Sequence, residues 1–165
     1  MSIRIYRSNS LEADVISSIE EGLRRIYGLE IVDGGVMRIP GEARGRHTIK
    51  EQYDAAFLLH HLIERGAGLA LWVIGEDLYV DGMNFVFGYG CPSAAILSVH
   101  RLHSQDLEVK EAVHEVGHAL GLGHCSHECV MQYSNSLAEA ERKPSALCAT
   151  CRAKVGKARL DPRCL

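Results

Sequence analysis

The 165-residue sequence has few aromatic residues, little net charge and no segment that fits a membrane-spanning helix. Aromatic residues make up only 6% of the chain, but 47% of its residues are hydrophobic, which is enough for an ordinary core and excludes disorder as the dominant state. The formal net charge of −3 argues against nucleic acid as the main ligand. These values fit one globular domain.

Signals for membrane insertion and secretion are also missing. Residues 82–99 are uncharged, but Gly88, Gly90 and Pro92 prevent them from crossing a bilayer as one helix at tolerable cost. The N-terminal residues, MSIRIYRSNS, lack the apolar core of a secretory signal. We therefore expect a cytoplasmic protein with no membrane partner.

Apolar residues repeat at strand spacing in some segments and at helical spacing in others. Residues 3–7 alternate between apolar and polar, and residues 69–74 form the continuous apolar run of a buried strand. Residues 11–27 and 106–121 have apolar positions on one helical face. Further predicted elements are strands at residues 29–33, 85–87 and 95–99, a turn at Gly34 and Gly35, a helix that begins with a capping box of Thr48 and Glu51, and a last helix at residues 144–155. The alternation indicates an α/β or α+β fold with a mostly parallel sheet.

Charge is distributed unevenly, because the last part of the chain is basic. Residues 139–165 contain three acidic residues and seven basic ones: Arg142, Lys143, Arg152, Lys154, Lys157, Arg159 and Arg163. We expect these basic residues to form the solvated face of a terminal helix, and contact with an acidic partner is the alternative.

The most specific motif is the segment HEVGHALGLGH at residues 114–124. His114 and His118 are four residues apart on the predicted helix, so both imidazoles lie on one face and can bind one metal ion. Glu115 lies beside the first imidazole and suits a general base that acts on metal-activated water. Gly121 ends the helix, and His124 can then return toward the ion.

Three protein ligands leave a fourth position open for water, as in catalytic zinc sites. We therefore expect His114, His118 and His124 to bind a catalytic zinc ion. The alternative is three core or surface histidines that bind no metal. A His-Glu-x-x-His pattern alone arises by chance, but the added Gly121 and His124 make the spacing specific.

Four of the six cysteines form two closely spaced pairs. The thiolates of Cys125, Cys129, Cys148 and Cys151 would close a tetrahedral zinc site that has no position for a substrate. Two disulfides and an iron–sulfur cluster are the alternatives, and the missing secretory signal weighs against disulfides. Because Cys125 directly follows His124, the two metal sites should fold together.

The other cysteines and histidines are expected to take no part in the chemistry. Cys91 is expected to be a free, partly buried thiol, and Cys164 to lie in a frayed tail. The remaining histidines are expected to be surface or core residues: His60, His61, His100, His103 and His127.

The histidine motif and the cysteine pairs together resemble the archaemetzincins, a branch of the metzincin zinc peptidases with a second zinc bound by four cysteines. The resemblance covers residues 111–151, about a quarter of the chain. It implies a metzincin-like fold, in which a mostly parallel twisted sheet with an antiparallel edge strand packs on the active-site helix. It also implies an N-terminal subdomain, residues 1–121, and a small zinc-stabilised C-terminal subdomain, residues 122–165.

The resemblance also implies roles for residues outside the metal ligands. Met131 would be the methionine of the turn beneath the metal, and residues 85–87 would lie near the edge strand that binds extended peptide. Tyr133 would stabilise the oxyanion of a tetrahedral intermediate, and simple packing is the alternative for this residue. Glu115 would be the general base and acid.

The main hypothesis is a monomeric zinc metallopeptidase with two zinc ions, one catalytic and one structural. Metal-activated water would attack a peptide or protein substrate, so no serine or cysteine nucleophile is assigned. A catalytically silent or latent module that binds peptides is the alternative, although a silent site has no use for Glu115. A zinc-ribbon-like nucleic-acid binder would leave the histidine helix unexplained.

Overall fold

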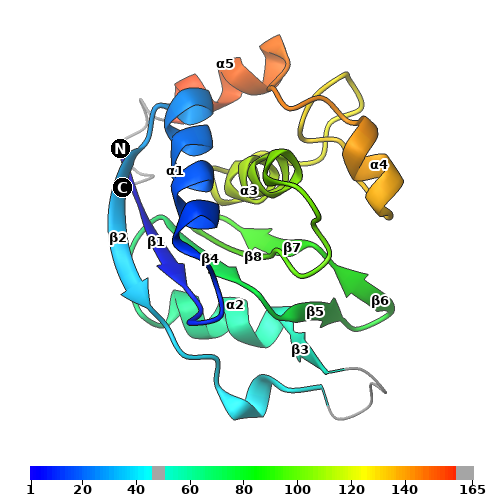
Figure 1. Cartoon of the computed structure of the whole chain (residues 1–165). Coiled ribbons are helices and arrows are strands. Elements are labelled where there is room, and N and C mark those ends of the chain that lie inside the picture. Colours follow the sequence, from blue (N-terminus) through cyan, green and yellow to red (C-terminus); the bar gives the residue numbers. More distant parts are fainter. Residues whose placement is uncertain (46–50, 159–165) are drawn as a thin grey trace.

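The computed structural model describes residues 1–45 and 51–158, which form a twisted sheet with helices on both faces (Figure 1). The main sheet contains five strands in the order β2 (Glu30–Val36), β1 (Ser2–Arg7), β4 (Ala70–Ile74), β8 (Ala94–Ser98) and β7 (Gly88–Cys91). All neighbouring pairs are parallel except β7 and β8. This confirms the predicted mostly parallel sheet with an antiparallel edge strand.

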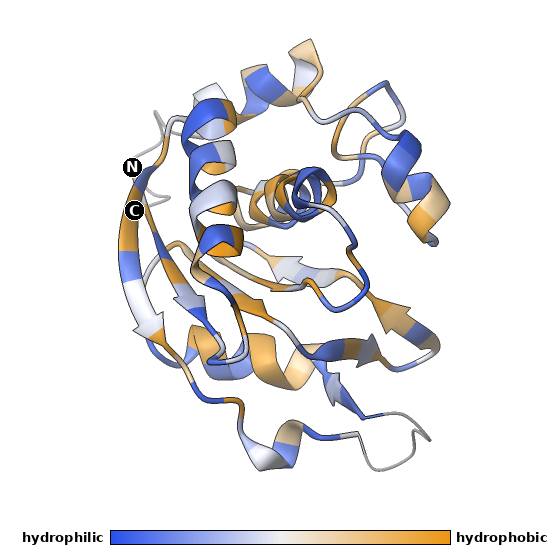
Figure 2. Ribbon diagram, in the orientation of Figure 1, coloured by the Kyte–Doolittle hydropathy of each residue, from blue (hydrophilic) through white to orange (hydrophobic). Residues whose placement is uncertain are grey.

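Helices cover both faces of this sheet. Helices α1 (Ala13–Tyr27) and α3 (Gln105–Ala119) lie on one face, and α2 (Ala55–Ile63) lies on the other (Figure 1). Figure 2 shows that α2 is largely hydrophobic, whereas α1 alternates between hydrophilic and hydrophobic residues. Among the described residues, no helix has the length and apolar character needed to cross a membrane.

Alternate residues of the central strands belong to two separate cores. In β4, Leu71 and Val73 join the core beneath α1 and α3, whereas Trp72 and Ile74 join the core beneath α2. Successive side chains of a strand point to opposite faces, so a strand covered on both sides must be apolar throughout. This is the physical reason for the continuous apolar run that the sequence contains at residues 69–74.

A smaller sheet, formed by β3 (Gln52–Asp54), β5 (Asp77–Val80) and β6 (Met83–Val86), lies beside the main one. Asp77 accepts hydrogen bonds from Arg101 Nε and Nη2, at 2.8 and 2.7 Å, and from Gln52 Nε2 at 2.9 Å. Burial disfavours ionisation of Asp77, but these hydrogen bonds outweigh burial and hold its pKa below the usual value. Arg101 also stacks over the ring of Phe85, 4.2 Å from its centroid, and so fixes β6 in place.

The predicted start of α2 is wrong. Residues 52–54 form β3, and the helix begins at Ala55, where the Asp54 carboxylate accepts hydrogen bonds from the backbone N–H groups of Ala56 and Phe57. Thr48 lies outside the described residues. Asp54 is a good N-cap residue, but the capping-box spacing of Thr48 and Glu51 placed the start too early.

Two further predictions need correction. Gly34 and Gly35 do not form a turn, because β2 continues through them with a register shift opposite β1 and a positive φ of 76° at Gly35. The predicted last helix at residues 144–155 corresponds to α5 (Ala149–Ala158), which begins later than predicted, and α4 (Leu137–Arg142) was not predicted. The predicted helix at residues 106–121 corresponds to α3, which begins where Ser104 caps the N–H of Leu107.

Candidate active site

Three histidines converge at the end of α3. His114 and His118 lie one turn apart, with ring centroids 4.7 Å apart and Nε2 atoms 3.1 Å apart. After α3 the chain reverses at Gly121, whose φ of 85° favours glycine. His124 therefore returns to within 4.8 Å of His118, measured between ring centroids. One ligand nitrogen from each of the three histidines lies within 4.8 Å of the others.

Backbone carbonyls fix which nitrogen of each helix histidine faces the shared centre. His114 Nδ1 lies 2.9 Å from the Val130 carbonyl oxygen, and His118 Nδ1 lies 2.8 Å from the Leu122 carbonyl oxygen. A carbonyl oxygen can only accept a hydrogen bond, so Nδ1 must carry the proton in both rings. The Nε2 lone pairs are then free to bind a cation.

Burial keeps the imidazoles neutral, which is the form that binds metal. It lowers the pKa of His114 to about 2 and also lowers the pKa values of His118 and His124. Two nitrogen ligands on one tetrahedral zinc, each about 2.0–2.1 Å from the ion, are roughly 3.4 Å apart. The 3.1 Å between the Nε2 atoms of His114 and His118 is close to this separation, so the donor set fits zinc.

Glu115 is buried between α3 and β7, with 5% of its surface exposed. A Cβ atom added to Gly88 would lie 2.5 Å from Glu115 Cδ, and one added to Gly90 would lie 2.9 Å from His118 Cβ. These two glycines of β7 therefore provide the space that Glu115 occupies beside the histidines. In the metal-free chain, burial and then the charge of Glu111 raise the pKa of Glu115 to about 8, and Lys143 opposes that rise.

Met131 packs directly against the turn of α3 that carries both helix histidines. Its side chain is fully buried, and a Cβ atom added to Gly117 would lie 2.3 Å from its sulfur. The flexible thioether thus forms an apolar support under the helix. On the neighbouring turn, the hydroxyl of Tyr27 donates a 2.7 Å hydrogen bond to the Val113 carbonyl, which fastens α1 to α3.

A cavity of about 240 Å³ lies between the histidines and the strands β6 and β7. Phe85 and Phe87 line its apolar wall, with their rings edge to face at a centroid distance of 5.3 Å. Tyr133 also lines the cavity, with its ring centroid 4.9 Å from that of His124, and 52% of its surface is exposed. The predicted tyrosine and edge-strand residues therefore lie around the same cavity as the histidines.

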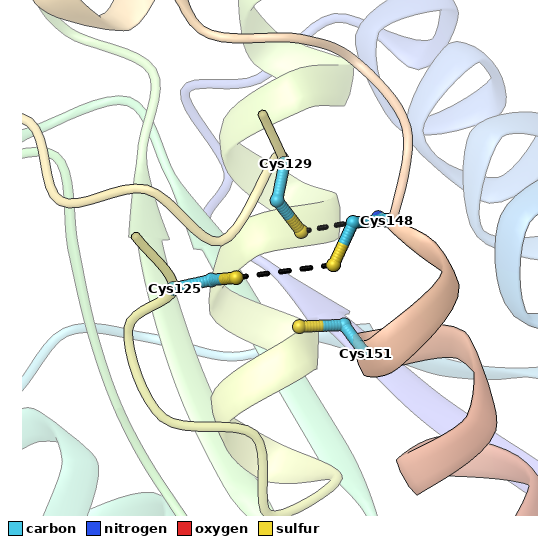
Figure 3. A group of neighbouring side chains, drawn as sticks. All are labelled: Cys125, Cys129, Cys148 and Cys151. Carbon is cyan, nitrogen blue, oxygen red and sulfur yellow. Dashed lines mark hydrogen bonds between the residues drawn. The ribbon is translucent and has the colours of Figure 1, made fainter. Parts of the chain in front are cut away.

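The four predicted cysteines meet between the loop after His124 and the start of α5 (Figure 3). Cys125 Sγ lies 3.8 Å from Cys148 Sγ, which is far longer than a disulfide bond of about 2.05 Å. Two thiolates on one zinc, each about 2.3 Å from the ion, are roughly 3.8 Å apart, so the cluster fits zinc. A hydrogen bond from the Cys151 backbone N–H lowers the pKa of Cys148 to about 6, which favours the thiolate that a metal binds.

Two buried charged residues of the cavity wall were not predicted from the sequence. Glu111 and Lys143 line the cavity, and only 2% and 4% of their surfaces are exposed. Lys143 was assigned to the solvated basic segment, which is wrong for this residue, although Arg142 and Arg152 are exposed. The position of Glu111, one turn before Glu115 on the same helical face, is the signal that could have found it.

The leftover cysteines contribute nothing to this cavity as far as the structure describes them. Cys91 is half-buried on β7, does not line the cavity, and its thiol faces the Pro92 carbonyl oxygen at 3.7 Å. Cys164, Arg159 and Arg163 lie outside the described residues.

Comparison with known proteins identifies the family. The family model for peptidase family M54 matches residues 49–157. An archaemetzincin from Saccharolobus solfataricus is 34% identical over 95% of this chain and 94% of its own length. The chain belongs to the archaemetzincins of peptidase family M54. It is therefore a zinc metallopeptidase by family.

Two other archaemetzincin comparisons support the same membership. The curated archaemetzincin from Archaeoglobus fulgidus is 45% identical over 64% of this chain and 70% of its own length. The crystal structure of the archaemetzincin from the same organism, complexed with malonate, superposes with a TM-score of 0.85. That superposition covers 93% of this chain and 99% of the solved chain at 34% identity. The metzincin-like fold implied by the sequence is thus confirmed.

The contact between β7 and Glu115 predicts a large effect for a single methyl group. In Gly88→Ala, the new Cβ overlaps the Glu115 carboxyl group, so overpacking should lower the free energy of unfolding by about 1–3 kcal/mol and turn the Glu115 side chain away from the cavity. Chemical denaturation and a crystal structure of the variant measure the two effects.

Gly41→Ala is the matched control, because a Cβ at Gly41 meets nothing within 4 Å. It should change the free energy of unfolding by less than about 0.5 kcal/mol. Equal stability of the Gly88 and Gly41 variants would contradict the close contact.

Proposed function

We propose that the chain hydrolyses peptide bonds with Glu115 as general base, and with His114, His118 and His124 as the ligands of the catalytic zinc. The observation that carries this proposal is the convergence of three imidazoles, two of them with Nε2 free to bind a cation, beside one buried carboxylate in one cavity. A site that only held metal for stability would need no carboxylate beside the ligands and no open face.

Each group of residues in the site has a separate role in the proposed hydrolysis. A bound zinc supplies the Lewis acid that makes water more acidic and polarises the scissile carbonyl. Glu115 accepts the proton of the attacking water at its carboxylate and passes it to the leaving amine. Gly88 and Gly90 hold Glu115 close to the histidines, and the Val130 and Leu122 carbonyls keep the imidazoles in the orientation that binds the metal.

The substrate in this proposal is an extended peptide that pairs with the edge of the sheet. Among the described residues, β7 pairs with β8 at one end of the main sheet and β6 pairs with β5 at one end of the smaller sheet, so each is an edge strand that can accept a further strand on its other side. Both strands border the cavity. A peptide that adds a strand there would lie across the histidines, held by its backbone.

The Glu115 role is tested with Glu115→Gln, which keeps the shape of the side chain and removes the base. We expect kcat for a peptide library substrate to fall by about 10²–10⁴, with KM and zinc content unchanged. Activity is measured with metal counting on the same samples. Undiminished hydrolysis by the variant would remove Glu115 from the mechanism, and inactive wild-type protein with full zinc would favour a silent peptide-binding module.

Tyr133 is proposed to stabilise the oxyanion with its hydroxyl, since its ring lies against His124 at the open side of the cavity. Tyr133→Phe keeps the ring and removes the hydroxyl, so kcat should fall about tenfold while zinc content stays the same. Steady-state kinetics and metal analysis measure both quantities. If kcat does not change, the ring has a packing role only.

We also propose that Cys125, Cys129, Cys148 and Cys151 hold a second, structural zinc that stabilises a C-terminal subdomain, residues 122–165. Cys148→Ser should remove one equivalent of zinc per chain and lower the thermal midpoint, because a thiolate ligand is lost. Inductively coupled plasma analysis and thermal melts measure both effects.

Cys91→Ser serves as the control for Cys148→Ser, since Cys91 is also a partly exposed thiol but lies outside the cluster. It should keep two zinc ions and the wild-type thermal midpoint. One zinc ion in the wild-type protein would refute the two-ion proposal, and iron in place of zinc would favour a cluster at the cysteines.

A further inference from the structure

A buried ion pair forms part of the wall of the active-site cavity. Lys143 Nζ lies 2.8 Å from Glu111 Oε1, and the two side chains are 2% and 3% exposed. Every other ion pair among the described residues has at least one side chain that reaches solvent. Burying two charges has a large desolvation cost, so the position of this pair needs an explanation beyond surface attraction.

The pair lies close enough to the site to act on it electrostatically. Glu111 precedes Glu115 by one turn of α3, and both residues line the cavity together with Lys143. Each charge of the pair, taken alone, would therefore change the field at the imidazoles and at Glu115.

A neighbouring lysine, Lys110, already holds α4 against α3. Lys110 Nζ donates hydrogen bonds to the carbonyl oxygens of Ala140 and Glu141, at 3.1 and 2.9 Å. These carbonyls belong to α4, so Lys110 fastens α4 to α3 from outside the cavity. The attachment of α4 to α3 therefore does not explain why a second lysine, Lys143, has its ammonium group buried against Glu111.

We propose that Lys143 and Glu111 are positioning residues of the peptidase site, whose opposite charges cancel beside the histidines and Glu115. Lys143 alone would repel a divalent cation from the imidazoles, and Glu111 alone would attract the cation and repel the Glu115 carboxylate. As a pair they leave Glu115 as the one carboxylate of the described cavity wall without a cationic partner. This inference rests on the proposed roles of Glu115 and the three histidines.

The test measures the zinc dissociation constant of the histidine site by chelator competition, with the cysteine site filled. Lys143→Met should bind zinc about tenfold more tightly and Glu111→Gln about tenfold more weakly, because opposite charges are removed. The double variant should return to within about threefold of wild type. A role in folding alone would weaken zinc binding in both single variants or in neither, and either result would overturn the proposal.

Kinetics of the zinc-loaded proteins provide the second measurement. In Lys143→Met the unbalanced Glu111 should lower kcat about tenfold with little change in KM, and the double variant should regain kcat to within about threefold. Lys110→Met is the matched control, because it removes the tether to α4 and leaves the cavity charges in place. If Lys110→Met changes zinc affinity or kcat as much as Lys143→Met does, the tether carries the effect and the proposal fails.

The two proposals fail in different ways. Undiminished hydrolysis by Glu115→Gln would overturn the proposed role of Glu115 and leave the opposite zinc shifts standing. An inactive Glu115→Gln together with unshifted zinc affinities would overturn the charge-balance proposal alone. If Lys143→Met does not fold, Glu111→Gln and the neutral double variant still decide the question, since weaker zinc binding in the first must be reversed in the second.

Discussion

The close packing of α3 on β7 is the constraint on which the rest of the site depends. Gly88 and Gly90 let the helix approach so near that the Glu115 carboxyl group occupies the space where side chains would otherwise lie. Gly117 permits an equally close approach on the other side, where Met131 supports the helix. With the helix held between these contacts, backbone carbonyls can orient the imidazoles of His114 and His118 by hydrogen bonds to Nδ1.

Most of the helices and strands, and the residues that meet at each metal site, could be predicted from the sequence, because these features follow from the spacing of nearby residues. The helical period placed α3, and the spacing of His114, His118 and His124 around Gly121 predicted a convergence that the structure contains. The four cysteines were likewise grouped correctly. The positions of these side chains do not by themselves show what each one does in catalysis, so the catalytic roles remain proposals.

Other features depend on contacts between distant residues and could not be predicted in this way. Nothing near Lys143 in the chain distinguishes it from the exposed arginines of the same segment, and its buried ion pair with Glu111 joins residues that are far apart in the sequence. The start of α2 was misplaced because Thr48 and Glu51 have a cap-like spacing, while Asp54 forms the real cap after a short strand. From the sequence, Gly88 and Gly90 indicated only that residues 82–99 do not form a membrane-spanning helix, and their close contacts with Glu115 and His118 depend on how β7 and α3 pack.

The hydrogen bond between His114 Nδ1 and the Val130 carbonyl also has a consequence for the order of synthesis. The helix that carries the histidines leaves the ribosome before residue 130, and Val130 is itself fixed by a backbone hydrogen bond to the Ala146 carbonyl. A nascent chain therefore contains the histidine helix before it contains the group that orients the first imidazole. The centre becomes complete only after residue 146 has been synthesised, so a chain that stops before that residue has a histidine helix without a finished site.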